Sequence, residues 1–156
     1  PMPCATAGAV AKVTTSVKRP DAQLAALTDG RSGPGSSIRS TPRFSWPEKA
    51  TGSQWIQYEW DQPHQISRTA VYWALDAPSP VYWRERTRGL LLKMPESWRL
   101  LYKDGEVWRQ VETRDAYGLL PDRTNELHFT PVTTTAVRLE TKMSDAPCGI
   151  QEWLIN

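Results

Sequence analysis

Proline and glycine interrupt this chain so often that long helices have almost no room. The 156 residues include thirteen Pro and nine Gly. Proline removes a backbone donor and clashes inside a helix, and glycine favours turns. Asp21 to Leu27 is the only segment that predicts a helical turn, because Pro20 begins it and Asp29-Gly30 ends it. The regular structure of the chain is therefore expected to come from strands.

The segments between these breaks are rich in β-branched and aromatic residues, a composition typical of strands. Asp104-Gly105 separates two such segments and predicts a hairpin with a type I′ turn. About eight strands are expected, at 11–18, 54–60, 66–75, 97–103, 107–112, 125–130, 132–142 and 149–155. Such a pattern indicates an all-β fold, a β-sandwich or jelly roll. No repeat or linker divides the chain, so residues 1–156 are interpreted as one domain.

The aromatic residues are mostly of the two kinds that have a polar atom. Eight Trp and five Tyr stand against two Phe, and Trp and Tyr suit wet binding surfaces as well as cores. Trp55, Trp73, Trp98 and Trp153 lie inside strand patterns, so we expect them in or near the core. Trp60 and Trp108 fit either place.

The charge balance argues against two broad classes of partner. Nineteen basic and seventeen acidic residues give a net charge of +2, which offers no general attraction for nucleic acid or an anionic membrane. No apolar run approaches the roughly 20 residues that span a bilayer. The sequence also lacks the nucleophile elbow, the phosphate loop and the zinc-protease motif. We expect a monomeric domain that is not an enzyme.

Four short motifs follow one another along the chain: Ala-Leu-Thr-Asp-Gly at 26–30, Gln-Trp-Ile-Gln-Tyr-Glu-Trp at 54–60, Val-Arg-Leu-Glu at 137–140 and Gly-Ile-Gln-Glu-Trp at 149–153. Together they resemble the discoidin or coagulation-factor type C family, which includes many galactose-binding-like carbohydrate-binding modules. The resemblance covers roughly residues 5–156. It implies a jelly roll, a binding role, a structural calcium and attachment to a larger extracellular enzyme.

Further stretches narrow this resemblance. Arg-Phe-Ser-Trp at 43–46, Val-Tyr-Trp at 71–73 and the segment 95–105 resemble the version of the domain appended to bacterial β-L-arabinofuranosidase-type glycoside hydrolases. The loop from Asp76 to Lys93 is longer and more basic than this version leads us to expect. Because ligand contacts in the family lie on such loops, the resemblance does not give the identity of the sugar.

The resemblance also implies a calcium site. In the family an Asp of the early turn and a Glu of the last strand converge on one ion, and here these are Asp29 and Glu152, with Leu27 supplying a backbone carbonyl. Calcium takes several oxygen ligands around such a turn. Arg31-Ser32-Gly33 is a poor anionic cage, however. The alternative is that Asp29 caps a turn and Glu152 forms a salt bridge.

Two long loops, 30–49 and 76–96, are the expected place of a binding site, because long loops in compact domains are usually functional or mobile. Three aromatic residues in them are candidates to stack on the C–H face of a sugar: Trp46, Tyr82 and Trp83. The candidates to bind hydroxyls or anionic substituents are Arg43, Arg84, Arg86, Lys93, Asp76 and Tyr117. The alternatives are that the aromatic rings close the end of the sandwich and that the charged loop is merely solvated.

The function that these features favour is that of a non-catalytic carbohydrate-binding module. It would be extracellular and would target a linked glycoside-active enzyme to a polysaccharide, with the arginine-rich loop favouring an anionic one. The alternative is a structural accessory domain that packs on a catalytic domain of the same parent chain without binding sugar. Cys4 and Cys148 either form a disulfide in an oxidising compartment or remain two thiols, and the sequence supports both equally.

Overall fold

The computed structural model describes residues 6–47, 50, 52–76 and 91–156. The predicted dominance of strands is confirmed, and helical structure is limited to two short elements. The elements in chain order are η1 (Ala7–Val10), β1 (Lys12–Thr15), α1 (Asp21–Ala26), β2 (Phe44–Ser45), β3 (Ser53–Ala74), β4 (Ser97–Asp104), β5 (Val107–Gln110), β6 (Thr124–Lys142) and β7 (Gly149–Ile155). No helix in the described residues is long and apolar enough to cross a membrane.

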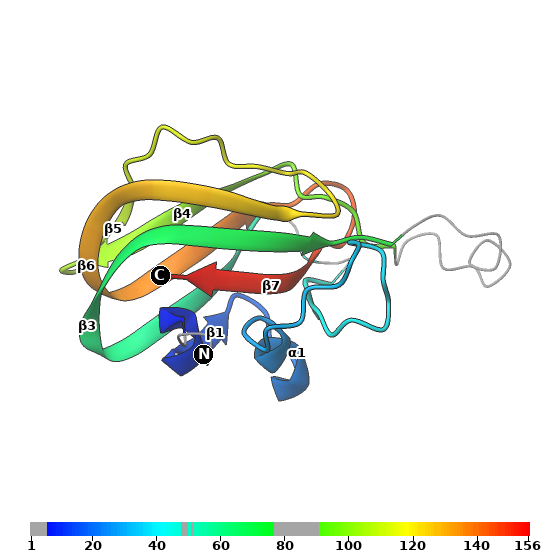
Figure 1. Ribbon diagram of the computed structural model, residues 1–156, viewed down its shortest axis with the longest axis horizontal. Coiled ribbons are helices and arrows are strands. Elements are labelled where there is room, and N and C mark those ends of the chain that lie inside the picture. Colours follow the sequence, from blue (N-terminus) through cyan, green and yellow to red (C-terminus); the bar gives the residue numbers. More distant parts are fainter. Residues whose placement is uncertain (1–5, 48–49, 51, 77–90) are drawn as a thin grey trace, which may run out of the picture.

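Strands β3 and β6 pair along almost their whole length and bend together, so that each contributes to both layers of a sandwich (Figure 1). In the first half of β3, Trp55 lies opposite Glu140, and in the second half Ala70 lies opposite Glu126. β1 and the β4–β5 hairpin join the first half, whereas β7 and β2 join the second. The strand order is β2-β7-β3-β6-β4-β5, with β1 attached to β3.

Each of these two strands was expected as a pair of separate strands. The register of β3 and β6 shifts between Glu59 and His64 and again between Ile66 and Arg68. Pro63 lies in the first of these irregularities. A proline cannot donate to the ladder, so it fits where the regular pairing is interrupted. The chain therefore bends at these positions without ending the strand.

The predicted hairpin is confirmed, but its turn differs from the expected type. Asp104 pairs with Val107, so the two central residues are Gly105 and Glu106. Only Gly105 has a positive φ, of 63°. A two-residue turn with glycine in the first central position and a single positive φ is type II′ and not type I′.

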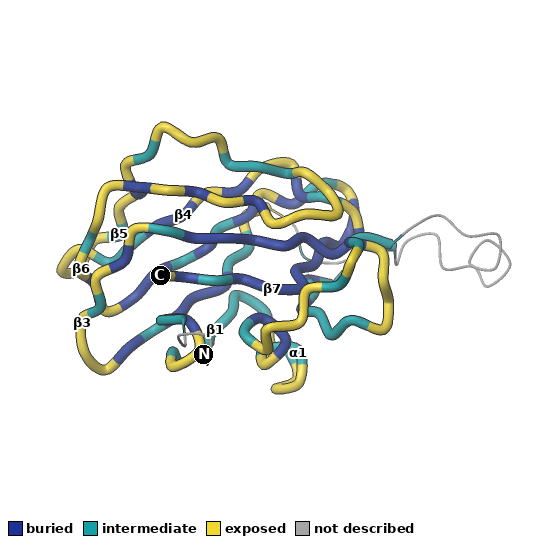
Figure 2. Tube along the Cα trace, in the orientation of Figure 1, coloured by how far each residue is buried: buried dark blue, intermediate teal, exposed yellow. Residues whose placement is uncertain are grey.

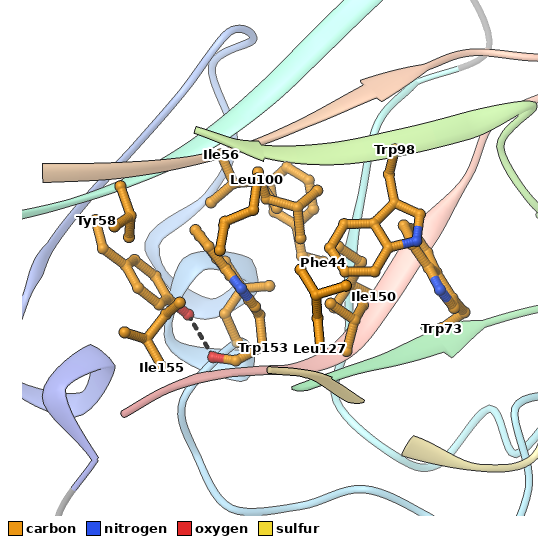
Figure 3. Close-up of a cluster of buried hydrophobic side chains, with 14 of the residues drawn as sticks. Phe44, Ile56, Tyr58, Trp73, Trp98, Leu100, Leu127, Ile150, Trp153 and Ile155 are labelled. Carbon is orange, nitrogen blue, oxygen red and sulfur yellow. Dashed lines mark hydrogen bonds between the residues drawn. The ribbon is translucent and has the colours of Figure 1, made fainter. Parts of the chain in front are cut away.

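The core lies between the two layers, where Figure 2 shows the strands buried, and it is dominated by large aromatic side chains. Trp73, Trp98 and Trp153 are buried as predicted. Tyr58 and Trp153 come from opposite layers and stack with ring centroids 4.0 Å apart (Figure 3). Burying such a ring contributes several kcal/mol, because truncation of a core Phe or Trp to Ala costs about 3–5 kcal/mol.

The core also satisfies the polar atoms of its aromatic rings. The Tyr58 hydroxyl donates to the Trp153 carbonyl at 2.8 Å. The indole nitrogens of Trp73 and Trp98 both donate to the Gly118 carbonyl, at 3.2 and 2.9 Å. These bonds fix the orientation of each ring, because a buried donor without a partner would be costly.

Trp55 is the exception among the tryptophans predicted to be in the core. It is half-buried on the outer side of β3, whereas its neighbour Ile56 points into the sandwich and is fully buried. Trp60 is buried and donates its indole N–H to the Ala7 carbonyl at 2.7 Å. Trp108 is half-buried.

Cys148 is a buried free thiol in the described part of the chain. Its Sγ lies 3.5 Å from the sulfur of Met143, and burial raises the pKa of the thiol to about 12. Cys4 lies outside the described residues, so the predicted choice between a disulfide and two thiols stays open.

Candidate functional site

Two of the predicted ligand residues, Arg43 and Asp76, lie together where the long loops meet. Arg43 Nη2 is 3.0 Å from Asp76 Oδ1, and Arg39 Nε is 3.3 Å from the same oxygen. The Asp76 side chain is only 3% exposed. Its second carboxylate oxygen accepts the Leu92 N–H at 3.0 Å, and the Asp76 N–H donates to the Leu92 carbonyl at 3.1 Å. The Asp76 carboxylate therefore ties together the two flanks of residues 77–90.

This arrangement gives the two residues different chemical capacities. The Asp76 carboxylate already accepts from three groups, so it has little capacity left for a sugar hydroxyl. Arg43 keeps a buried Nη1 that has no hydrogen-bond partner among the described residues, while its side chain is 22% exposed. A buried donor without a partner is rare in proteins. Arg43 is therefore the described loop residue best suited to donate to a ligand oxygen.

Two further predicted ligand residues lie nearer the surface. Lys93 is 61% exposed, and its Nζ lies 4.0 Å from Asp145 Oδ1. Tyr117 is half-buried and packs edge-on against Trp98, with ring centroids 4.9 Å apart. Its hydroxyl accepts from Gln110 Nε2 at 3.3 Å. None of the hydrogen bonds or ring contacts of the described residues joins Tyr117 to Arg43 or Asp76.

Trp46 does not fit its predicted stacking role. Its side chain is fully buried and meets the Phe44 ring edge-on, with centroids 4.9 Å apart. β2 pairs with β7, with Phe44 opposite Ile150, and the Trp46 N–H donates to the Cys148 carbonyl at 2.9 Å. This pairing carries the Trp46 ring into the sandwich, so it closes the core and offers no face to a sugar. The other predicted stacking and cationic residues, Tyr82, Trp83, Arg84 and Arg86, lie outside the described residues.

The two carboxylates predicted for calcium do meet at one turn. Glu152 is 5% exposed, and its Oε1 accepts the Gly30 N–H at 3.1 Å. Its Oε2 is buried and has no hydrogen-bond partner among the described residues. Burial raises the pKa of the Glu152 carboxyl to about 7, the Gly30 amide opposes this rise, and the nearby Asp29 carboxylate adds to it. A carboxylate oxygen left unpaired beside a second carboxylate is an oxygen donor set that suits a hard cation.

The remaining oxygens of this turn are largely engaged. The Leu27 carbonyl accepts the Trp153 N–H at 2.8 Å, and one Asp29 oxygen accepts the Arg31 N–H at 2.8 Å. In the described chain no three His, Cys, Asp or Glu side chains gather into a metal-binding group. The carboxylates thus fit calcium, while any further ligands would have to come from carbonyls or water.

Gln151 holds the following loop and was missed by the sequence analysis. Its Oε1 accepts the Gly33 N–H at 2.8 Å, and its Nε2 donates to the carbonyls of Gly35 and Ser36, at 3.0 and 3.2 Å. One buried amide therefore ties three residues of the loop to β7. Its place directly before Glu152, in a strand whose alternate side chains were expected to face solvent, gave no signal of this role.

The largest depression in the described part of the chain, of about 490 Å³, lies away from these loops. It is lined by residues 112–115 and 128–130, and His128 Nδ1 lies 3.3 Å from Asp115 Oδ2. Both side chains are exposed, and Phe129 is buried. The depression offers charged groups but no open aromatic face, so it does not resemble a sugar platform.

No protein-family model matches the sequence, and no curated protein is similar to it. Solved structures are similar to it. The β-galactosidase BgaA of Streptococcus pneumoniae matches at 14% identity with a TM-score of 0.72, over 96% of this chain and 93% of that chain. Chitosan-binding module 1, from a chitosanase/glucanase of Paenibacillus sp. IK-5, matches at 16% identity with a TM-score of 0.61, over 94% of both chains.

A third similar structure is a Clostridium perfringens module, CpGH89CBM32-5, in complex with GalNAc-β-1,3-galactose. It matches at 15% identity with a TM-score of 0.61, over 93% of this chain and 94% of that one. At these identities the likeness establishes the fold, and the predicted galactose-binding-like β-sandwich is confirmed. The neighbours include carbohydrate-binding modules, but they do not single out the arabinofuranosidase-type enzymes.

Proposed function

We propose that this chain is a non-catalytic carbohydrate-binding module that holds a linked glycoside-active enzyme close to its polysaccharide. The observation that carries the proposal is the fold, which this chain shares at nearly full length with a chitosan-binding module and with a module bound to a disaccharide. Tethering raises the effective concentration of the enzyme at its substrate, so a single weak site is sufficient. The proposed setting is extracellular.

The proposed sugar site lies at the loop end of the sandwich. Arg43 supplies a fixed donor there, because Asp76 holds its guanidinium at 3.0 Å while Nη1 remains unpartnered among the described residues. Tyr82 and Trp83 are the proposed aromatic platforms, and Arg84, Arg86 and Lys93 are the proposed contacts to an anionic substituent. The buried Asp76 acts on the sugar only through Arg43 and through the loop flanks that it joins.

We further propose that Asp29 and Glu152 hold a calcium ion, with the Leu27 carbonyl as a third ligand. The unpaired oxygen of Glu152 supports this proposal. The ion would have a structural task, because the turn at Gly30 lies between α1 and the loop that Gln151 ties to β7. It would fix the base of the loop and would take no part in chemistry.

Affinity gel electrophoresis against neutral and acidic plant and algal polysaccharides, with and without calcium, tests the proposal. Specific retardation of the wild-type protein is expected. Trp83→Ala should remove most of that retardation, and Trp83→Phe, which keeps an aromatic face, should retain it. If no polysaccharide retards the protein, the chain is a structural accessory domain. The fully saturated Asp76 cluster and the buried Trp46 would suit that second function equally well.

A further inference from the structure

The outer face of the first layer carries an aromatic and cationic cluster that the loop site does not include. Strand pairing puts Gln57 of β3 directly opposite Arg138 of β6. The Arg138 guanidinium carbon lies 4.4 Å from the centroid of the Trp55 ring and 4.3 Å from that of the Trp108 ring. The guanidinium is therefore enclosed between two indoles on a strand surface, and we call these four side chains the outer-face cluster.

Trp108 has to cross a strand to reach this position. It belongs to β5, and β4 separates β5 from β6 in the sheet. Leu101, on β4, lies opposite Arg138 and is only 6% exposed, although its position places it on the outer face. The Trp108 ring thus lies over β4, and both indoles are held by the sheet, so little side-chain entropy remains to be lost when a ligand binds.

The Arg138 guanidinium is oriented by one buried amide. Gln57 is 7% exposed, and its Oε1 accepts from both Nε and Nη2 of Arg138, at 3.0 and 2.7 Å. The Gln57 amide nitrogen in turn donates to Glu59. This uses the side edge of the guanidinium and leaves its end, formed by Nη1 and the second Nη2 hydrogen. No acceptor among the described residues contacts Nη1, and the end edge of a guanidinium matches a carboxylate in a bidentate way.

The charge of the surrounding strands is consistent with an anionic ligand. Lys12, Arg99 and Lys103 share the outer face with Arg138, and the acidic residues there, Glu59 and Glu140, are already engaged. Glu140 accepts from Arg99 at 2.8 Å, and Glu59 accepts from Gln57. Burial lowers the pKa of Arg138, which means that the guanidinium is partly removed from water. Partial dehydration strengthens its attraction for an added carboxylate.

We propose that the outer-face cluster is a second binding site, which takes the carboxylate of a uronic acid residue in an acidic polysaccharide. The end of the Arg138 fork pairs with the carboxylate, and the two indoles pack on the C–H groups of the sugar ring on either side. This site is separate from the loop site and stands whether or not the loop site binds sugar. It gives the module a surface that runs along the strands, where a chain can lie.

Titration of the protein with an oligogalacturonate, followed by calorimetry and by ¹H–¹⁵N spectra of the indole N–H groups, tests this proposal. We expect shifts at Trp55 and Trp108, and binding that falls at least about tenfold in Arg138→Gln, since a charge-assisted bidentate pair is lost. The matched control is Arg109→Gln, which removes one charge from the residue next to Trp108, where Arg109 pairs with Asp104 at 2.7 Å. That control should bind within about twofold of wild type.

Further arms make each outcome decisive. The same oligosaccharide after reduction of its carboxyl groups should bind about tenfold more weakly or not at all. If Arg138→Gln does not fold by circular dichroism, Trp108→Leu replaces it, and it should weaken binding about threefold or more. Equal binding by Arg138→Gln and wild type overturns the proposal, as does an equal loss in Arg109→Gln. Loss only in Trp83→Ala also overturns it, and would assign the uronate to the loop site while leaving the proposed function intact.

Discussion

Tyr58 and Trp153 join the two layers of the sandwich twice, once through their stacked rings and once through a hydrogen bond. The rings are 4.0 Å apart at an interplanar angle of 22°, and the Tyr58 hydroxyl donates to the Trp153 carbonyl at 2.8 Å. Neither group has access to water, because both residues are fully buried. The hydroxyl and the ring therefore make separable contributions to stability.

Tyr58→Phe keeps the ring and removes only the hydroxyl. We expect a loss of about 1–2 kcal/mol in the free energy of unfolding, because the Trp153 carbonyl is left buried without that donor. Tyr102→Phe is the matched control, since Tyr102 is half-buried and its hydroxyl makes no hydrogen bond in the described chain; it should change stability by less than about 0.5 kcal/mol. Urea denaturation measures both, and equal effects would show that the Tyr58 hydrogen bond adds nothing.

The metal-free protein should lose stability as the pH rises toward neutrality. The Glu152 carboxyl has a folded-state pKa of about 7 against an ordinary value of 4.5. The folded state therefore holds the proton more tightly, so the contribution is complete below pH 4.5 and is lost as the pH rises through 7. We expect a decrease of about 1–3 kcal/mol over this range. Denaturation in the presence of a chelator should show it in wild type and not in Glu152→Gln, and a parallel profile in the variant would contradict the assignment.

Calcium should reverse that trend, because a bound cation keeps Glu152 and Asp29 ionised. We expect added calcium to raise the melting temperature of the wild-type protein at pH 7 and a chelator to lower it. Asp29→Asn and Glu152→Gln should each abolish the response. Glu126→Gln, which removes an exposed carboxylate on another face, should keep it. An unchanged melting temperature of the wild-type protein at millimolar calcium would refute the proposed site and leave Gln151 as the device that holds the loop.

Asp76→Asn should destabilise the domain, because it leaves Arg39 and Arg43 without the buried carboxylate that now lies 3.3 and 3.0 Å from them. The expected loss is about 1–3 kcal/mol, below the value for a fully buried pair since both arginines retain some exposure. Glu96→Gln is the control: its partner is Lys142, at 3.1 Å, and both side chains are more than half exposed. Such a surface pair is worth about 0–1 kcal/mol. Comparable losses in both variants would mean that Asp76 is not an anchor.

The sequence was sufficient for the strands and insufficient for their faces. The boundaries predicted for the last strand, 149–155, match β7, because its apolar run is bounded by a clear break. Trp55 was expected in the core because its segment places aromatic or apolar residues on both faces. With Trp55 on one side and Ile56, Tyr58 and Trp60 on the other, alternation alone does not say which side is covered. The second layer makes that choice.

The candidate site depended even more on distant partners. Trp46 lies in a loop by local pattern, and only the pairing of Phe44 with Ile150 turns it inward. Arg39 and Gln151 gave no local signal, since their partners lie 37 and about 115 residues away in the sequence. The turn chemistry at Asp29-Gly30 and the acidic residue of the last strand were recognisable because the resemblance named both positions.

The shared bending of β3 and β6 also governs how the chain reaches its native state. Because both strands run through both layers, neither layer can be completed while the other is absent, and a half-formed sandwich has no stable place on the way. Contacts such as Trp55 with Glu140 join residues far apart in the chain, and folds dominated by such contacts are slow to form. The module therefore gains a single cooperative unit at the cost of a slow search, during which the edges of its longest strands are open to other chains.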